Sequence, residues 1–261
     1  MSDFIPTTNA PLDISNPALI RQVAERMKAL GFRKKMEVPR EAVFHEVDRG
    51  GAVTDLADRV APPISPVACL ARCFVFDNLT EERAMRQQLG EEFVDLCFGL
   101  GLLERRGGMV AGAVCILPGD DHANFCDHSR TAERQEMQEF VMGPALSTRH
   151  LIGSIPKRRH GRFLDLCGGS GAAALSAAPR AESVITADYN ERALNLARFA
   201  AAWNGLQEVE VRFTDRFSGV AGETFDLIAC NPPFAIKPSH GAMFLSGGMN
   251  GDGFCEQIIR G

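Results

Sequence analysis

The chain shows two rhythms of hydrophobic and polar residues, one in residues 1–145 and another in residues 146–261. In the first part, apolar residues recur every three or four positions, which is the spacing of an amphipathic helix. The clearest case is the stretch 16–31, because Asn16 suits a helix N-cap and Pro17 suits the first turn. One face of this predicted helix is apolar, with Leu19, Ile20, Val23, Met27 and Leu30. We therefore expect it to pack on another part of the protein.

Residues 65–127 combine helical and strand patterns. They predict helices over 66–76, 79–90 and 91–108, followed by two strands within 109–127 that are joined at 118–121. Helices followed by a β-ribbon resemble a winged-helix module, which binds DNA in some proteins and serves dimerisation or substrate docking in others. We therefore expect residues 1–145 to form a mostly helical, winged-helix-like domain.

The second part alternates strands with helices. The predicted strands are 162–167, 183–188, 209–215 and 225–230, and the predicted helices are 170–179 and 190–206. Strands that alternate with helices over units of about 30 residues predict a parallel sheet with helices on both faces. Residues 146–261 are therefore expected to form an α/β domain.

The composition is that of an ordinary globular protein. Hydrophobic residues make up 45% of the 261 residues and charged residues 23%. No apolar run approaches the roughly 20 residues that cross a bilayer, and residues 1–15 lack the basic start and apolar core of a signal peptide. We therefore expect a cytoplasmic protein. Its eight cysteines include no CxxC pair, which favours reduced core thiols over disulfides or a structural metal site.

The net charge of −5 comes from the first part of the chain. Residues 1–150 contain 17 Lys and Arg against 22 Asp and Glu, whereas residues 151–261 contain 11 of each. Neither part is strongly basic, so tight binding to nucleic acid through phosphate neutralisation is not indicated. The acidic balance favours docking over DNA binding for the winged-helix-like domain. We interpret the basic run PKRRHGR, residues 156–162, as a solvated loop.

A glycine-rich loop follows the first predicted strand of the second domain, in the sequence LDLCGGSGAAA. Gly168, Gly169 and Gly171 allow a tight turn and a close approach of the backbone to a ligand. The helix that follows directs its N-terminal amides at whatever the loop holds. The loop also satisfies the dinucleotide fingerprint GxGxxG/A, with Asp188 at a suitable distance, so a nicotinamide or flavin enzyme is one alternative. A purely structural turn between strand and helix is another.

Four successive predicted strands end in residues that suit one ligand, since ligands of such sheets bind beyond the carboxyl ends of the strands. Asp165 precedes the glycines, where a carboxylate suits an ammonium group better than a pyrophosphate. Asp188 can accept hydrogen bonds from two ribose hydroxyls. Asp215 can accept one from an adenine amine, with Phe217 beside it to stack. The fourth strand runs into Asn231.

With these residues, roughly residues 149–261 resemble the class I S-adenosylmethionine-dependent methyltransferases. They are similar to the branch with a small methyltransferase domain and an NPP[YF] motif, which includes glutamine N-methyltransferases of release factors and RNA base N-methyltransferases. The resemblance implies a Rossmann-like domain that binds S-adenosyl-L-methionine. The cofactor contacts that it implies are Asp165, Cys167, Gly168, Gly169, Gly171, Asp188, Tyr189, Asp215, Phe217 and Asn231. Cys167 departs from the family pattern, which has a glycine there.

The motif Asn231-Pro232-Pro233-Phe234 suits methyl transfer to a planar nitrogen. The lone pair of an amide or base amine is delocalised, so this nitrogen is a weak nucleophile. The Asn231 side-chain oxygen and the Pro232 carbonyl can each accept one of its N–H groups and stabilise the developing positive charge. Proline brings no competing N–H, and Phe234 can stack on the planar group. We therefore predict Asn231, Pro232 and Phe234 as catalytic residues; the alternative is that Asn-Pro-Pro merely ends a buried strand.

The sequence thus predicts an N-methyltransferase for a protein glutamine or an RNA base. Its alternatives are a methyltransferase for a small metabolite and a non-catalytic, cofactor-binding regulator that uses the winged-helix-like domain on DNA. A homodimer is also considered, whereas no membrane partner and no structural metal are expected. Only 27 residues follow Phe234, and the resemblance implies a helix and about three more strands. We therefore expect the sequence to stop before the end of the domain.

Overall fold

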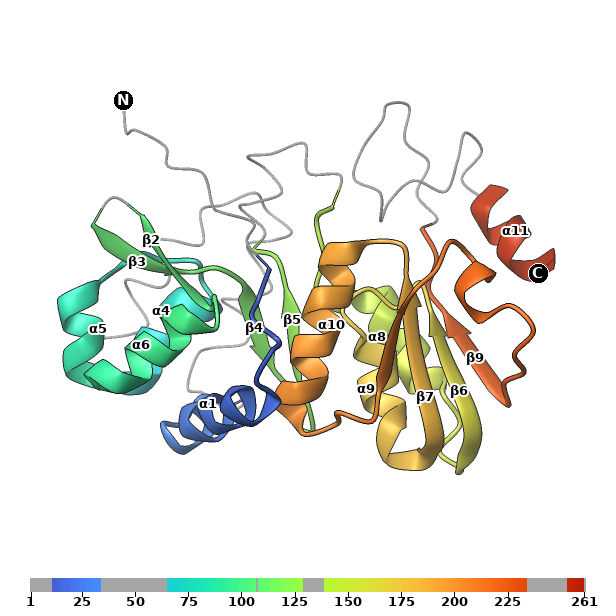
Figure 1. Ribbon diagram of the computed structural model, residues 1–261, viewed down its shortest axis with the longest axis horizontal. Coiled ribbons are helices and arrows are strands. Elements are labelled where there is room, and N and C mark those ends of the chain that lie inside the picture. The colour runs from blue at the N-terminus through green and yellow to red at the C-terminus, as the bar shows by residue number, and fades with distance from the viewer. Residues whose placement is uncertain (1–10, 34–64, 107, 129–138, 234–252, 261) are drawn as a thin grey trace. The chain divides into compact units, whose positions relative to one another are not determined.

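The computed structural model describes residues 11–33, 65–106, 108–128, 139–233 and 253–260. The chain divides into two compact units, Met1–Ala123 and Asn124–Gly261. The boundary predicted after residue 145 lies inside the second unit. Each unit is described below by itself, with the element labels of Figure 1.

The first unit begins with helices, as predicted. Its elements are α1 (Pro17–Ala29), α4 (Pro66–Phe74), β1 (Thr80–Glu81), α5 (Glu82–Leu89), α6 (Glu91–Gly99), β2 (Leu103–Arg106), β3 (Met109–Gly112) and β4 (Cys115–Pro118). The cap predicted at Asn16 is confirmed, because its Oδ1 accepts a hydrogen bond from the Leu19 N–H at 3.0 Å. The predicted apolar face of α1 is also confirmed, since Ile20, Val23 and Met27 are buried.

The single helix predicted over 91–108 is wrong, because α6 ends at Gly99 and β2 follows it. Gly101 adopts a φ of +73°. Its N–H donates to the Phe98 carbonyl at 3.0 Å, and the Leu102 N–H donates to the Cys97 carbonyl at 2.9 Å. These two bonds form a Schellman motif, in which a left-handed glycine ends a helix.

Strands β1, β3 and β2 form an antiparallel sheet in that order. The order of elements is helix, strand, two helices and two strands from α4 to β3. The winged-helix likeness of the unit stays a prediction.

The second unit shows the predicted alternation of strands and helices. Its elements are α8 (Leu146–Ser154), β6 (His160–Leu166), α9 (Ala172–Ala177), the short η1 (Ala178–Arg180), β7 (Ala181–Asp188), α10 (Glu191–Asn204), β8 (Glu210–Phe213), the short η2 (Ser218–Val220), β9 (Leu227–Cys230) and α11 (Gly253–Arg260); β5 (Ala123–Cys126) precedes them. The sheet has the order β8-β7-β6-β9, and all of its pairs are parallel (Figure 1). The α/β fold and the parallel sheet are therefore confirmed.

Both faces of this sheet are covered, as predicted. One face forms a buried cluster of Leu164, Leu166, Ile185, Ala187 and Val220, against which Phe217, Phe225 and Ile258 of α11 pack. The other face carries Asp165 and Thr186, because side chains alternate along a strand. There the Asp165 carboxylate accepts a hydrogen bond from the Ala174 N–H of α9. Because all pairs of its described strands are parallel, their carboxyl ends lie at a single edge of the sheet.

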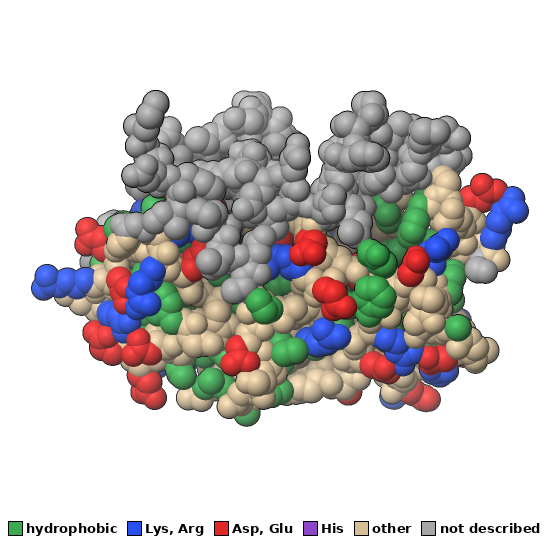
Figure 2. Space-filling view, turned by 45° about the horizontal axis from the view of Figure 1, so that its top comes forward, with side chains coloured by type: hydrophobic (Ala, Val, Ile, Leu, Met, Phe, Trp, Pro, Cys, Tyr) green, Lys and Arg blue, Asp and Glu red, His purple; other side chains and the backbone are tan. Residues whose placement is uncertain are grey.

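Within the described residues, no helix is long and apolar enough to cross a membrane. Nor do three or more His, Cys, Asp or Glu side chains gather there as ligands for a metal ion. The eight cysteines are free thiols. On the face seen in Figure 2, acidic and basic side chains of the described residues lie interspersed.

Candidate functional site

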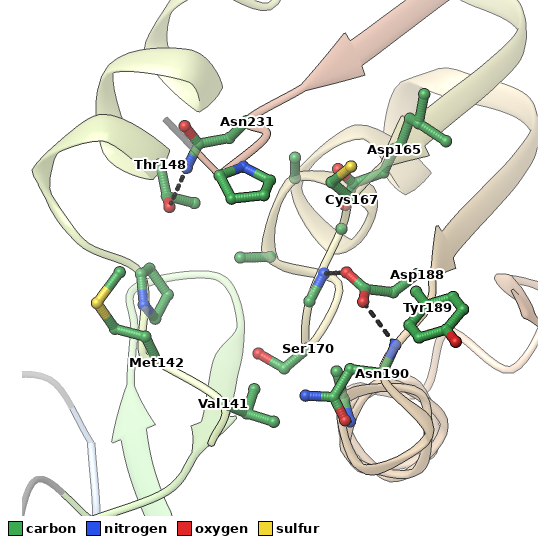
Figure 3. Close-up of a pocket in the computed structure, with 18 of the residues that line it drawn as sticks. Val141, Met142, Thr148, Asp165, Cys167, Ser170, Asp188, Tyr189, Asn190 and Asn231 are labelled. Atoms are coloured by element: carbon green, nitrogen blue, oxygen red, sulfur yellow. Dashed lines mark hydrogen bonds between the residues drawn. The ribbon is translucent and has the colours of Figure 1, made fainter. Parts of the chain in front are cut away.

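A cavity of about 490 Å³ opens at the carboxyl ends of the strands of the second unit (Figure 3). It is bordered by residues that follow β6, β7, β8 and β9, by residues 140–144, by Thr148 and Leu151 of α8, and by Phe254 of α11. Eight residues proposed from the sequence line it, namely Asp165, Cys167, Gly168, Gly169, Asp188, Tyr189, Asp215 and Asn231. Gly171, Phe217 and Pro232 do not line it, and Phe234 lies outside the described residues.

The loop after β6 needs its glycines for conformation and for space. Gly169 and Gly171 have φ values of +56° and +82°, which glycine adopts at little cost. A Cβ atom at Gly168 would lie 2.2 Å from the Thr186 hydroxyl oxygen and 2.9 Å from the Asp165 carboxylate. The loop therefore lies directly on the end of the sheet, with its backbone facing the cavity.

Cys167 also adopts a left-handed conformation, with a φ of +56°. The position that departs from the family pattern therefore keeps the backbone that glycine favours. A left-handed residue with a Cβ atom is strained by roughly 1–2 kcal/mol. Burial and the neighbouring Cys230 raise the pKa of the Cys167 thiol, the hydrogen bond with Cys230 being the largest cause.

Asp165 is buried at the base of the loop. Its Oδ2 accepts hydrogen bonds from the Ala174 N–H at 3.0 Å and from the Thr186 hydroxyl at 3.5 Å. Burial raises the pKa of the Asp165 carboxyl from 3.8 to about 7, the charge of Asp188 acts in the same direction, and the two hydrogen bonds oppose both. The carboxyl group therefore changes its charge near neutral pH.

Asp188, at the end of β7, fastens the loop to the start of α10 (Figure 3). Its Oδ2 accepts from the Gly169 N–H at 2.8 Å and its Oδ1 from the Asn190 N–H at 2.9 Å. Burial raises the pKa of this carboxyl, against the backbone hydrogen bonds that lower it. Each carboxylate oxygen has a second lone pair, so Asp188 can still accept two hydrogen bonds from a ligand.

The aromatic side chain at this end of the cavity is Tyr189 rather than Phe217. The Tyr189 ring lies 5.3 Å from the Phe213 ring, and both are about half exposed. Phe217 instead packs against the buried cluster on the opposite face of the sheet. Phe213 supports the Tyr189 ring but does not itself line the cavity.

Asn231, at the end of β9, is held by α8. Its Nδ2 donates to the Ser147 hydroxyl at 3.3 Å and to the Thr148 hydroxyl at 3.2 Å. Figure 3 shows the Asn231 amide directed at Thr148 along the border of the cavity. Neither hydroxyl was predicted, because these residues lie more than 80 positions before Asn231 in the sequence.

Residues 145–244 match the family model of the methyltransferase small domain. This segment is therefore similar to the members of that family. It contains all four described strands of the parallel sheet, α8 and the NPPF motif. The resemblance deduced from the sequence is thereby confirmed for the second unit.

Among the similar proteins are two relatives and one solved structure, each of which matches part of the chain. The release factor glutamine methyltransferase of Xylella fastidiosa (strain 9a5c) is 42% identical over 83 residues, which cover 30% of each chain. The ribosomal protein uL3 glutamine methyltransferase of Bordetella pertussis is 33% identical over 112 residues, 38% of this chain and 37% of the relative. The ribosomal protein L11 methylase structure from Lactobacillus delbrueckii subsp. bulgaricus is 26% identical over 34% of this chain and 48% of that one, with a TM-score of 0.31. The chain thus spans about a third of the length of the curated relatives that it matches.

One wall of the cavity, residues 140–144, lies just before the matched segment. The Val141 N–H donates to Asp127 Oδ2 at 2.8 Å, and the Val141 carbonyl accepts from the Asp127 N–H at 2.9 Å.

Two residues at the start of α10 hold this wall. Arg192 pairs with the Asp127 carboxylate, its Nε lying 2.9 and 3.0 Å from the two oxygens. Asn190 donates to the Glu139 carbonyl at 2.9 Å. The wall is therefore fastened to the start of α10, next to Asp188, and no local feature of the sequence predicts these contacts.

Proposed function

We propose that this protein is an S-adenosylmethionine-dependent methyltransferase that methylates the side-chain nitrogen of a protein glutamine. The observation that carries the proposal is that Asp188, the glycine loop and Asn231 border one cavity. The family of residues 145–244 supports the reaction class. The names of the two relatives support glutamine as the acceptor.

The residues of the cavity fit the cofactor. The loop packs against the sheet at Gly168, where a Cβ atom would lie 2.2 Å from the Thr186 hydroxyl oxygen. At Gly169, which lines the cavity, an added Cβ atom would meet nothing within 4 Å, so a ligand can approach the backbone there closely. In the proposal, Asp165 and the loop hold the methionine part, Asp188 accepts the two ribose hydroxyls, and Tyr189 with Asp215 contacts the adenine. When bound, the cofactor supplies an electrophilic methyl group on a positively charged sulfur.

The proposed acceptor site uses Asn231, which lines the cavity, together with Pro232, the next residue, which does not line it. The Asn231 Oδ1 and the Pro232 carbonyl each accept one N–H of the glutamine side chain, which holds its nitrogen in line with the methyl group. Transfer would break the bond between the methyl carbon and the sulfur, form the new N–C bond and release S-adenosylhomocysteine. The nitrogen would become positive in this step, and the two oxygens would stabilise that charge. The methylated nitrogen then releases one proton to water. Phe234 is proposed to stack on the planar group.

The alternative acceptors, an RNA base and a small metabolite, remain open predictions. We favour glutamine because both relatives named above are glutamine methyltransferases. The first unit is proposed to dock the acceptor protein, in keeping with its acidic composition. The relatives are named for a release factor and a ribosomal protein, and we propose the cytoplasm, where an acceptor of that kind would be met, as the site of action.

Asn231→Ala tests the proposal. We expect the rate of methyl transfer to glutamine-containing peptides to fall at least 100-fold. The substitution leaves one of the two hydrogen-bond acceptors that hold the glutamine nitrogen. The affinity for S-adenosylhomocysteine, measured by calorimetry, should stay within about threefold. Peptides with glutamate in place of glutamine are the matched negative control.

The possible failures point to different errors. A wild-type protein that does not bind S-adenosylhomocysteine contradicts the cofactor assignment. Binding without transfer to any glutamine peptide, but with transfer to RNA or to metabolites, contradicts the acceptor. An equal loss of affinity and rate in Asn231→Ala contradicts the role given to Asn231.

A further inference from the structure

The Asn231 amide is held by two hydroxyl groups from consecutive residues of α8. Its Nδ2 lies 3.3 Å from Ser147 Oγ and 3.2 Å from Thr148 Oγ1. Asn231 and Thr148 both border the cavity. The contact thus joins the first turn of a helix that precedes the sheet to the end of its last described strand.

These hydroxyls are not used in the usual way for the start of a helix. Serine and threonine in such places commonly cap the helix through their side-chain oxygens. Helix α8 instead has Ala145 at its N-cap, with no side-chain cap bond. Its first turn carries no acidic residue either. The two hydroxyls are therefore directed toward Asn231 without any gain for the helix terminus.

A primary amide can present either an acceptor or two donors to a neighbour. The nitrogen that receives the methyl group carries two hydrogens, so it is a hydrogen-bond donor and needs the side-chain oxygen of Asn231. If it faced the Asn231 NH2 group instead, one donor would lie against another. In the structure, the nitrogen side is occupied by Ser147 and Thr148. The side-chain oxygen of Asn231 is therefore left to accept a hydrogen bond from the group that receives the methyl.

We infer that Ser147 and Thr148 are positioning residues for Asn231, which fix its side chain so that Oδ1 accepts an N–H of the methyl acceptor. This inference rests on the proposed function. Two bonds from a rigid helix restrict both side-chain torsions of Asn231 before the acceptor binds. Such pre-organisation acts on the rate of the chemical step more than on the binding of either substrate.

The test combines kinetics with a spectroscopic measurement that needs no turnover. Thr148→Val keeps the shape of the side chain and removes its hydroxyl, Thr148→Ser keeps the hydroxyl, and Ser147→Ala removes the second partner. For the double variant Ser147→Ala/Thr148→Val, we expect kcat on the glutamine peptide to fall 10- to 100-fold. KM and the S-adenosylhomocysteine affinity should each change by less than about threefold, and Thr148→Ser should restore most of the rate lost in Thr148→Val.

The side-chain NH2 signals of Asn231 in a ¹⁵N-labelled sample report the positioning directly. They are assigned by their loss in Asn231→Ala. In the double variant, we expect them to move toward the positions of an asparagine in a short peptide and their hydrogens to exchange faster with water. Ser154→Ala is the matched control, because Ser154 is an exposed hydroxyl of the same helix that donates to the His150 carbonyl. It should change neither the signals nor the rate.

The outcomes separate this inference from the proposed function. Unchanged Asn231 signals in the double variant overturn the positioning role, whether or not the wild type is active. A wild type without methyl transfer, but with signals that move in the double variant, overturns the proposed function and leaves the contact supported. Shifted signals with an unchanged kcat show a structural contact only and overturn the inference. If the double variant does not fold, the comparison of Thr148→Val with Thr148→Ser decides.

Discussion

Asp188 ends β7, and Asp215 follows the neighbouring strand β8. Both border the same cavity, but their surroundings differ. Both oxygens of Asp188 accept backbone hydrogen bonds, from Gly169 and from Asn190. The Asp215 side chain is about half exposed and pairs with its sequence neighbour Arg216 at 3.0 Å. The same residue type at equivalent places therefore organises the site in one case and lies at its border in the other.

The position of each strand in the sheet explains this difference. Strand β7 lies between β6 and β8, whereas β8 has a partner on one side only within the described sheet. The end of β7 is therefore covered by the loops of its neighbours, and a carboxylate there meets backbone N–H groups. After the end of β8, the carboxylate of Asp215 meets solvent and the partly exposed side chain of Arg216, which screen its charge.

The largest expected effect comes from removing the charge of Asp188. In Asp188→Asn, the side chain keeps one acceptor oxygen, so the N–H of Gly169 or of Asn190 loses its partner and the loop loosens. We expect the affinity for S-adenosylhomocysteine to fall about 100-fold, which corresponds to about 2.7 kcal/mol. Calorimetry measures it directly.

Asp215→Asn is the matched comparison, because it removes the same charge at the end of the neighbouring strand. Its carboxylate makes no backbone contact that holds the glycine loop. We therefore expect an affinity loss of less than about threefold. Equal losses in the two variants would contradict the distinction between the buried and the exposed carboxylate.

The pH dependence of binding extends the comparison to Asp165. Burial raises its pKa in the folded protein from 3.8 to about 7. Between these values the folded state keeps a proton that the unfolded state has lost, so the contribution of Asp165 to stability falls as pH rises through this range. A ligand with an ammonium group prefers the ionised carboxyl, so its affinity should rise over the same pH values where Asp165 loses its proton.

From pH 6 to pH 8, the ionised fraction of a group with a pKa of about 7 rises about tenfold. We therefore expect the dissociation constant of S-adenosylhomocysteine to fall by up to about tenfold over that range. Asp165→Asn should flatten the profile, whereas Asp215→Asn should retain it. Calorimetry at several pH values, in buffers of different ionisation enthalpy, also reports the proton released on binding. An unchanged profile in Asp165→Asn would assign the titration to another group.

The convergence of Asp165, Asp188, Asp215 and Asn231 could be predicted from the sequence. The alternation of strands and helices specifies a parallel sheet, and parallel strands bring their carboxyl ends to one edge. Knowing where each strand ends is then enough to group the residues that follow. The glycine loop could be predicted for the same reason, because its glycines directly follow a strand.

The position of Phe217 and the hydrogen bonds of Asn231 could not be predicted, because they depend on contacts that no local sequence pattern encodes. Phe217 lies only two residues beyond Asp215, but Arg216 adopts a φ of +54° and the chain turns there. The ring consequently packs against the core rather than facing the cavity. Ser147 and Thr148 meet Asn231 across more than 80 residues of sequence. The predicted helix extends past Gly99 because Gly99 and Gly101 stand inside an apolar pattern, whereas the positive φ of Gly101 ends α6 in the structure.

The smallest expected effect concerns the loop that Asp188 fastens. Cys167 and Gly169 share a φ of +56°, but only Cys167 has a Cβ atom there. Cys167→Gly relieves roughly 1 kcal/mol of strain, which the greater freedom of glycine in the unfolded chain partly offsets. We expect a net gain of about 0.5 kcal/mol, seen as a melting temperature higher by about 1–2 °C.

Gly169→Ala is the reverse experiment, because an added Cβ atom at Gly169 meets nothing within 4 Å and the change is purely conformational. It should lower the stability by about 1 kcal/mol. If both substitutions lower the stability, the thiol of Cys167 contributes more through its contact with Cys230 than the left-handed backbone costs. In that case the loop has exchanged the usual glycine for a packing contact, and the affinity for S-adenosylhomocysteine should fall together with the melting temperature in Cys167→Gly.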